Sequence, residues 1–176
     1  MLGIDPELPT DFKVDWNKSD IIELSNSLKR PQKESADIGL AMDVLEHIDD
    51  ENMALQGWNN SLKKNALMFV TVPAFQALWS YHDEFLDHKR RYTKDQLTNV
   101  LKMNGFEKVK VTYAFSFIFP LVYLIRKLSK GKESTQDLAL PPMLINSILF
   151  LCGKVENILG GFPFFGTSVI GIYRKI

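Results

Sequence analysis

The chain has 176 residues, which is enough for one domain with a sizeable core. Its hydrophobic content of 45% is ordinary for a globular protein and argues against a disordered chain. The formal net charge is zero, so composition gives no reason to expect a nucleic-acid partner. The single cysteine, Cys152, cannot form an internal disulfide, which fits a reducing compartment such as the cytoplasm.

Targeting and membrane signals are weak. The first 20 residues are acidic and contain Pro6 and Pro9, so no secretory signal is predicted. The longest apolar run, 113–125, has about half the length that a membrane span needs and contains Pro120. We therefore expect a cytoplasmic protein without a spanning helix.

The predicted elements alternate between strands and helices, which indicates an α/β fold. Short apolar or alternating runs predict strands at 2–5, 12–16, 38–42, 66–72, 107–115 and 167–174. Helical spacing and capping residues predict helices at 49–64, 93–105, 120–130 and 143–159. The segment 75–92 is aromatic and charged without a sustained period, as expected of a functional loop over the strand ends.

The run 38–42 has too few polar positions to alternate, which predicts a strand buried on both faces of a parallel sheet. It ends in two acids and a histidine, namely Asp43, Glu46 and His47. Ligands of open parallel sheets bind just outside the carboxyl ends of the strands. We therefore expect chemistry at these three residues.

At this point the sequence resembles a known family. Segment 43–48 (DVLEHI) resembles the fourth-strand motif of class I S-adenosylmethionine-dependent methyltransferases. One bacterial branch of that family, with small or lipid-linked acceptors, is similar in further segments, which are 72–74, 78–80, 82–83, 88–92, Pro163 and 166–168. The resemblance covers nearly the whole chain, but it lacks the first strand and its glycine-rich turn, because no Gly-x-Gly occurs.

The resemblance implies a single methyltransferase-like domain over 1–176 with a Rossmann-like class I fold, truncated at its N-terminus. Such a domain has a mostly parallel sheet, helices on both faces and an antiparallel edge strand. Segment 116–161 would then be a helical insertion between the last two strands. The implied reaction is methyl transfer from S-adenosylmethionine to a small or lipid-linked acceptor, at oxygen or carbon.

The same resemblance suggests cofactor contacts, which are Asp5, Asp20, Ile21, Asp43 and Glu46. Asp5 would bind the ribose hydroxyls, and Asp20 with Ile21 would bind the adenine. Each has a structural alternative: Asp5 could begin a turn, and Ser19 or Asp20 could cap a helix running to Leu28.

Three histidines are candidates for catalysis, because histidine is the usual general base near neutral pH. They are His47 at the reaction end, and His82 and His88 in the loop expected to close over the acceptor. The alternative for His47, as for Glu46, is that it only begins a helix and satisfies free amides.

Beside His88, three residues are candidate acceptor contacts, namely Arg90, Arg91 and Tyr92. The arginines could hold a phosphate or carboxylate by forked hydrogen bonds. The alternative is a basic turn that solvates a helix start, with Tyr92 packed beneath it.

A metal site made of His82, Asp83 and His88 is the weaker interpretation of this loop. The chain has no His-x-x-x-His pair and only one cysteine, so we expect no metal.

The apolar segments 113–125 and 138–165 are explained mostly by core packing. They could also form a lid for an apolar acceptor, with nearby cations facing anionic headgroups at a membrane surface. Those cations are Arg126, Lys127, Lys130 and Lys132.

Two further hypotheses follow from the missing glycine-rich turn. The chain could be a non-catalytic methyltransferase-like module that serves as a partner or a membrane-surface subunit, or a fragment of a longer enzyme. A missing first strand would also leave a strand edge open to pairing with another chain, so an oligomer is one expected outcome.

Overall fold

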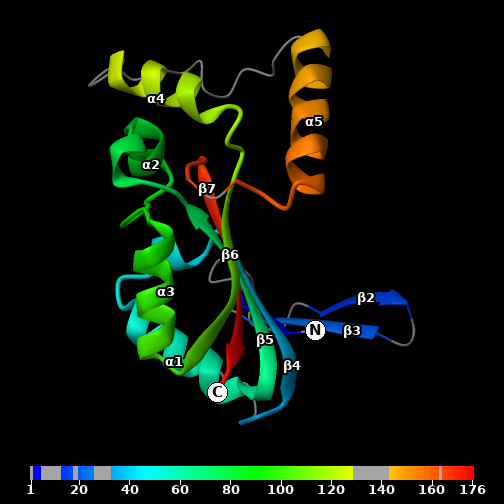
Figure 1. Cartoon of the computed structure of the whole chain (residues 1–176). Coiled ribbons are helices and arrows are strands. Elements are labelled where there is room, and N and C mark those ends of the chain that lie inside the picture. The colour runs from blue at the N-terminus through cyan, green and yellow to red at the C-terminus, as the bar shows by residue number, and fades with distance from the viewer. Residues whose placement is uncertain (1, 5–12, 18–19, 26–32, 129–142, 163) are drawn as a thin grey trace.

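The computed structural model describes residues 2–4, 13–17, 20–25, 33–128, 143–162 and 164–176, which form two sheets and several helices (Figure 1). The strands are β1 (Leu2–Ile4), β2 (Lys13–Asn17), β3 (Asp20–Ser25), β4 (Ala36–Met42), β5 (Leu62–Pro73), β6 (Phe106–Ala114) and β7 (Ser168–Lys175). The helices are α1 (Glu51–Ser61), α2 (Tyr81–Phe85), α3 (Lys94–Met103), α4 (Phe119–Leu128) and α5 (Met143–Ile158), with single 3-10 turns at η1 (Leu45–His47) and η2 (Gln76–Leu78).

The larger sheet has the strand order β4-β5-β7-β6. β4 and β5 are parallel, whereas β7 is antiparallel to both of its neighbours. β4, β5 and β6 therefore run in the same direction, and their carboxyl ends share one edge of the sheet with the start of β7. The predicted α/β fold and the antiparallel pairing of the last two strands are confirmed. The reversed strand lies one position inside the edge, and α4 and α5 separate β6 from β7 in the chain.

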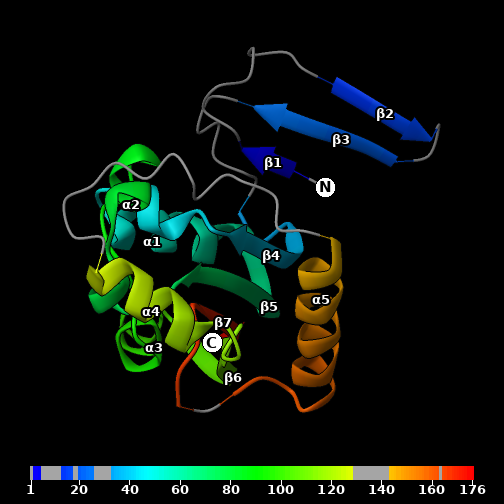
Figure 2. The ribbon, with the colours of Figure 1, turned by 90° about the horizontal axis from the view of Figure 1, so that it is seen from above.

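The N-terminal strands form a second sheet of order β1-β3-β2. Both views place it beyond β4, on the side away from β5 (Figures 1 and 2). β1 is parallel to β3, and β2 is antiparallel to it. Asp20 and Ile21 thus begin a strand, so the alternative of a helix capped by Asp20 is wrong, because this backbone is extended and paired with β2. Asp5 lies outside the described residues.

The core lies between the larger sheet and the helices α1 and α3, which cover one face of it (Figure 1). From Ala66 to Val72, every second residue of β5 points to this face and is buried, as Met68, Val70 and Val72 show. The helices contribute buried leucines, which are Leu55, Leu97 and Leu101. This alternation is the pattern of a sheet with one face in the core and the other more open.

The prediction that 38–42 is buried on both faces is wrong. Ile38, Leu40 and Met42 are 58%, 52% and 49% exposed, and only Ala41 of this segment is buried. The reason is that β4 pairs with β5 alone among the described strands, and α1 and α3 cover a single face. Helices on both faces are likewise not seen in the described part of the chain, where only the end of α5 approaches the second face, near β6 and β7.

Three helix ends agree with their capping signals, and one does not. Thr93 and Gln96 form the predicted capping box of α3, and Gly105 follows its end with φ +82°. α1 begins after Asp50, whose carboxylate accepts a hydrogen bond from Met53 N, but it ends at Ser61 rather than 64. The lysines expected in its last turn belong to β5. No helix in the described part of the chain is long and apolar enough to cross a membrane.

Candidate active site

A pocket of about 730 Å³ lies at the edge of the sheet where β5 and β6 end and β7 begins. Aromatic and aliphatic side chains from the segment after β6, from α4 and from α5 form most of its wall. Its cationic and histidine side chains are His82, His88, Arg91, Arg126 and Lys154. This is the position at which open parallel sheets bind ligands, and the pocket has the size of a small-molecule site.

Three backbone positions at this edge are strained. Asp43 follows β4, Phe75 lies two residues after β5, and Phe115 follows β6, with φ of 51°, 53° and 58°. A non-glycine residue in this left-handed region costs ~1–3 kcal/mol and is retained where the surroundings enforce it, often at functional sites. Strain at three neighbouring strand ends supports a functional edge.

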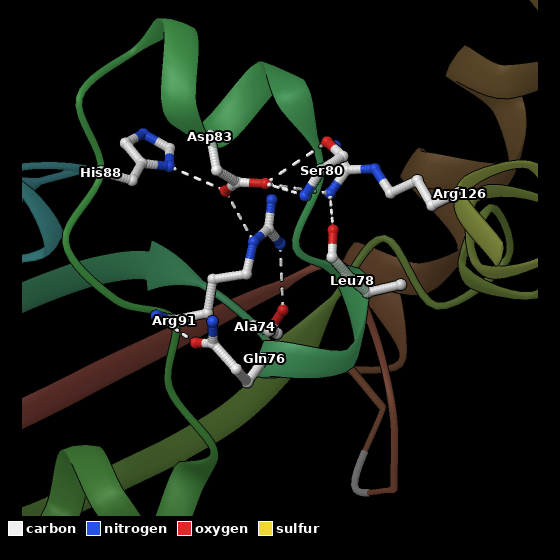
Figure 3. Close-up of polar contacts among 8 residues, drawn as sticks. All are labelled: Ala74, Gln76, Leu78, Ser80, Asp83, His88, Arg91 and Arg126. Carbon is white, nitrogen blue, oxygen red and sulfur yellow. Dashed lines mark hydrogen bonds and ion pairs between the residues drawn. The ribbon is translucent and has the colours of Figure 1, made fainter. Parts of the chain in front are cut away.

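Asp83 in α2 is the centre of a buried polar cluster beside the pocket (Figure 3). Its side chain is fully buried, and its Oδ1 accepts a hydrogen bond from Arg91 Nε at 2.7 Å and lies 2.9 Å from His88 Nδ1. Its Oδ2 accepts from Ser80 N at 2.9 Å and lies 3.7 Å from Arg126 Nη1. Burial alone would raise the pKa of Asp83, but the hydrogen bonds from Arg91 and His88 lower it below its usual value. Asp83 is therefore a charged, fully satisfied anchor.

The two arginines around Asp83 also bind backbone carbonyl groups. Arg91 Nη1 donates to Ala74 O at 3.1 Å, and Arg126 Nη1 donates to Leu78 O. Arg91 thus fixes the loop to the end of β5, and Arg126 fixes α4 to the loop. One hypothesis from the sequence was that Arg126 faces a membrane surface, whereas its side chain is turned inward and is 19% exposed. A basic residue at a helix end is so common that no sequence signal distinguished it.

Arg90 and Tyr92, predicted as acceptor contacts, lie on the other side of the loop. The Tyr92 hydroxyl donates to Glu51 Oε2 at 2.5 Å, and Arg90 Nη1 lies 3.2 Å from the same oxygen. Burial and the Glu51 carboxylate raise the pKa of Tyr92 above its usual value. Neither residue lines the pocket, whereas His82, His88 and Arg91 do.

Glu46 is the second fully buried carboxylate of this region, and it differs from Asp83. Neither of its carboxylate oxygens has a hydrogen-bond partner in the described structure. Burial raises the pKa of Glu46 to about 7, and the nearby charge of Asp43 adds to this effect. Its backbone carbonyl accepts a hydrogen bond from Lys89 N at 2.7 Å, which ties η1 to the loop.

His47 is exposed, and its ring meets that of His88 edge to face, with centroids 4.7 Å apart. Glu46, His47 and His88 each bring one potential ligand atom within 4.8 Å of the others. The structure therefore joins one predicted cofactor contact and two predicted catalytic histidines into one cluster. His82 is outside that cluster.

Asp43 is exposed at the end of β4, and its backbone N–H donates to Thr71 O and Oγ1, both at 3.0 Å. It lies beside the exposed apolar side chains of β4, and the sequence resemblance would place S-adenosylmethionine here. The described glycines with positive φ are Gly105, Gly160 and Gly161, none of which adjoins β4. The residues that are described therefore fit only part of this cofactor.

No protein-family model matches the sequence, and no curated protein matches it by sequence. Solved structures match the fold. A methyltransferase dependent on S-adenosylmethionine from Mesorhizobium loti aligns with a TM-score of 0.55 and 10% identity, over 99% of this chain and 80% of that chain. One from Thermotoga maritima, named as a possible histamine N-methyltransferase, aligns with a TM-score of 0.53 and 16% identity.

The second match covers 88% of this chain and 64% of the Thermotoga protein, so the chain spans less than two thirds of that relative. The cyclase SpnF also matches, with a TM-score of 0.50 and 18% identity, over 88% of this chain and 57% of that chain. The same fold thus occurs in a protein named for a different reaction, and function has to be argued from the site. By structure, this chain has the Rossmann-like class I methyltransferase fold.

Proposed function

We propose that this protein transfers a methyl group from S-adenosylmethionine to an acceptor with an anionic group and an apolar part. The observation that carries the proposal is the pocket at the carboxyl edge of the sheet, which is lined by cations and, over most of its wall, by apolar side chains. Methyl transfer needs mainly that donor and acceptor are held in line. A pocket at this edge of a class I fold supports that arrangement.

Asp43 is the proposed contact to the cofactor at the reaction end, because its carboxylate is exposed where β4 stops. Glu46 was predicted to share this role, but it is fully buried. The assignments of Asp5, Asp20 and Ile21 rest on the family resemblance alone. When bound, the cofactor would supply an electrophilic methyl group.

On the acceptor side, Asp83 fixes the orientation of His88 by binding Nδ1, which leaves Nε2 to act on a ligand. For a hydroxyl acceptor, His88 or His82 would take the proton. Arg91 spends two of its donors on Asp83 and Ala74, so its contribution to an anionic acceptor is mainly positive charge. Lys154, which is exposed and lies 4.8 Å from the Phe150 ring, can bind an anionic group directly.

The helices above the pocket favour a lipid-linked acceptor. Leu124 and Leu128 of α4 and Phe150 and Leu151 of α5 are all more than half exposed. Apolar side chains in such numbers on two helices, with Lys127 and Lys154 among them, suit contact with an anionic membrane surface. Lys130 and Lys132 lie outside the described residues.

The first test is calorimetric titration of S-adenosylmethionine into the purified chain. We expect binding in the micromolar range, weakened at least tenfold by Asp43→Asn. Asparagine is suited to the left-handed backbone of position 43, so this variant should fold. The matched control is Asp37→Asn near the other end of β4, which should bind like the wild type. Absence of binding would overturn the proposal for this chain and favour the non-catalytic module.

The acceptor class is tested by incubating the protein with labelled S-adenosylmethionine and a bacterial extract, then separating organic and aqueous phases. Label in the organic phase indicates a lipid-linked acceptor, and label in the aqueous phase indicates a small soluble one. Co-sedimentation with vesicles of phosphatidylglycerol and phosphatidylcholine tests the surface contact. Equal sedimentation with pure phosphatidylcholine vesicles would refute the role of anionic lipid.

A further inference from the structure

We infer that Glu46, His47 and His88 form a binding site for a divalent transition-metal ion, with Zn²⁺ as the best fit. Two imidazoles and one carboxylate are a ligand set that holds Zn²⁺ and leaves a further position open. The inference goes beyond the proposed methyl transfer and does not depend on it.

The first observation is the carboxylate of Glu46. It is 0% exposed, and neither oxygen has a partner in the described structure. Burying a carboxylate is costly unless a partner compensates it, so native proteins pair such groups or use them to coordinate metals. A cation at this position would satisfy the oxygens that the fold leaves without partners.

The second observation is the orientation of His88. Its Nδ1 lies 2.9 Å from Asp83 Oδ1, and its side chain is 9% exposed. A histidine that binds a carboxylate through one ring nitrogen presents the other as a metal ligand, and this carboxylate–histidine–metal arrangement is common. The charge of Asp83 is already balanced by Arg91, so Asp83 orients the ring without competing for the ion.

The third observation is the position of His47. Its ring is edge to face with that of His88, and the three potential ligand atoms lie within 4.8 Å of one another. Ligand atoms of a tetrahedral Zn²⁺ site lie ~3.4 Å apart, given metal–ligand distances of ~2.1 Å. Because His47 is exposed, rotation of its side chain can close the difference, and solvent gives the ion an entry path.

Such an ion would lie beside the pocket, because His88 also lines it. An acceptor hydroxyl or a water molecule could occupy its open position. The site gives Glu46 a role other than the predicted cofactor contact, and it gives His47 and His88 a role other than that of general base. His82, which lies outside the cluster, remains available for proton transfer.

The site departs from the sequence-based expectation of no metal, and it uses other residues than the set considered there. Asp83 in that set is occupied by its cationic and amide partners, and His82 lies outside the cluster. The three ligands come from η1 and from the loop before α3, which meet only in the folded chain. No ligand spacing in the sequence could have revealed them.

The test is titration of Zn²⁺, by calorimetry, into the full chain after treatment with a chelator, and of Co²⁺ by visible absorption. We expect one equivalent of either ion to bind, with a micromolar or lower Kd for Zn²⁺ and a Co²⁺ spectrum of four- or five-coordinate nitrogen and oxygen ligation. Absence of binding, or binding of several weak equivalents, would overturn the inference. Neither readout needs the methyl donor, so failure here leaves the titration of S-adenosylmethionine unaffected.

Variants assign the ligands. His47→Asn should weaken Zn²⁺ binding at least tenfold, and because His47 is exposed this variant should fold even if Glu46→Gln or His88→Asn does not. The matched control is His82→Asn, which removes the histidine of this chain that lies outside the cluster and should leave the Zn²⁺ Kd unchanged. Asp83→Asn should weaken binding ~10–100-fold without removing a ligand, provided that its circular dichroism stays native. Equal affinity of His47→Asn and wild type, or loss of binding in His82→Asn, would refute the site.

Discussion

Two fully buried carboxylates lie near the same edge of the sheet and have opposite surroundings. Asp83 receives hydrogen bonds from Ser80, His88 and Arg91 and lies beside Arg126, whereas Glu46 has no partner for either oxygen among the described residues. The pKa of Asp83 is lowered by its partners, and that of Glu46 is raised by burial. The first carboxylate is stabilised by the fold, and the second is left for a proton or a ligand.

This difference separates a structural acid from a candidate functional one. Asp83 joins the end of β5, α2 and α4, so the pocket's shape depends on it although its own oxygens are not available to a ligand. Glu46 makes no such connection through its side chain, and the fold bears the cost of burying it. Buried acids without partners are expected where a protein needs a ligand or a tuned proton.

The largest expected effect is that of Asp83→Ala. The substitution leaves Arg91 and His88 buried without their anion, and loss of one member of a buried ion pair costs ~3–5 kcal/mol. We expect a decrease of that size in the free energy of unfolding, measured by urea denaturation. Asp87→Asn is the control, since its carboxylate is exposed and asparagine suits the left-handed backbone of this position (φ 55°), and it should leave the midpoint unchanged. An Asp83→Ala variant as stable as the wild type would contradict the structural role.

Glu46→Gln should increase the free energy of unfolding of the metal-free protein near neutral pH, whereas Asp83→Ala decreases it. Burial raises the pKa of Glu46 from its usual value of 4.5 to about 7 in the folded state, so the stabilisation from Glu46 is present below pH 4.5 and is lost as the pH rises through 7. That loss is ~3 kcal/mol, since one pKa unit corresponds to ~1.4 kcal/mol. Glutamine cannot ionise, so the variant does not lose this stability as the pH rises.

The measurement is thermal unfolding of both proteins in chelator from pH 4.5 to pH 8. Glu46→Gln should be the more stable at pH 8, and the difference should shrink toward pH 4.5. Asp83 has the reverse dependence: its lowered pKa stabilises the fold above the usual pKa of aspartate, and that contribution is lost as the pH falls through the folded-state value. A difference between wild type and Glu46→Gln that does not depend on pH would contradict the burial of an ionisable carboxylate.

Arg126→Met should have a smaller effect. Asp83 keeps Arg91 at 2.7 Å, and the lost ion pair is longer, at 3.7 Å. Methionine retains the apolar stem, so we expect a loss of ~1–2 kcal/mol from the ion pair and the hydrogen bond to Leu78 O. Lys127→Met, one residue along α4 and exposed, is the control and should change stability by less than ~0.5 kcal/mol. Equal effects of the two variants would mean that Arg126 faces solvent, as its sequence position suggested.

The order along the chain of the strands of the larger sheet and of the helices beside it could be predicted, because capping residues and alternation are local sequence signals. Thr93 and Gln96 cap α3, Gly105 follows its end, and alternation marks β6. The burial of 38–42 could not be predicted correctly, because it depends on what lies beside β4. A short apolar run has the same sequence pattern whether one face of its strand is covered or both are.

The site divides in the same way. His82, His88 and Arg91 were found as candidates because polar residues in a long loop over strand ends are expected at a pocket, and they line it. Which partner each side chain of this loop binds depends on the tertiary structure. Arg91 binds Asp83, whereas Arg90 and Tyr92 bind Glu51. The isolation of Glu46 could not be read from the sequence either, because a helix-starting glutamate is normally solvated.

Ser80→Ala should have the smallest effect and tests how fully Asp83 is satisfied. The Ser80 hydroxyl lies 3.4 Å from Asp83 Oδ2, a long contact, whereas the backbone N–H of Ser80 donates to the same oxygen at 2.9 Å and survives the substitution. Removing a capping hydroxyl costs ~0.5–2 kcal/mol, and we expect the lower end because Asp83 retains its other partners. Urea denaturation of Ser80→Ala and Asp83→Ala measures the loss in the free energy of unfolding for each variant. A loss for Ser80→Ala close to that of Asp83→Ala would mean that the hydroxyl, and not the arginines, holds Asp83 in place, and the contrast with Glu46 would then rest on one weak bond.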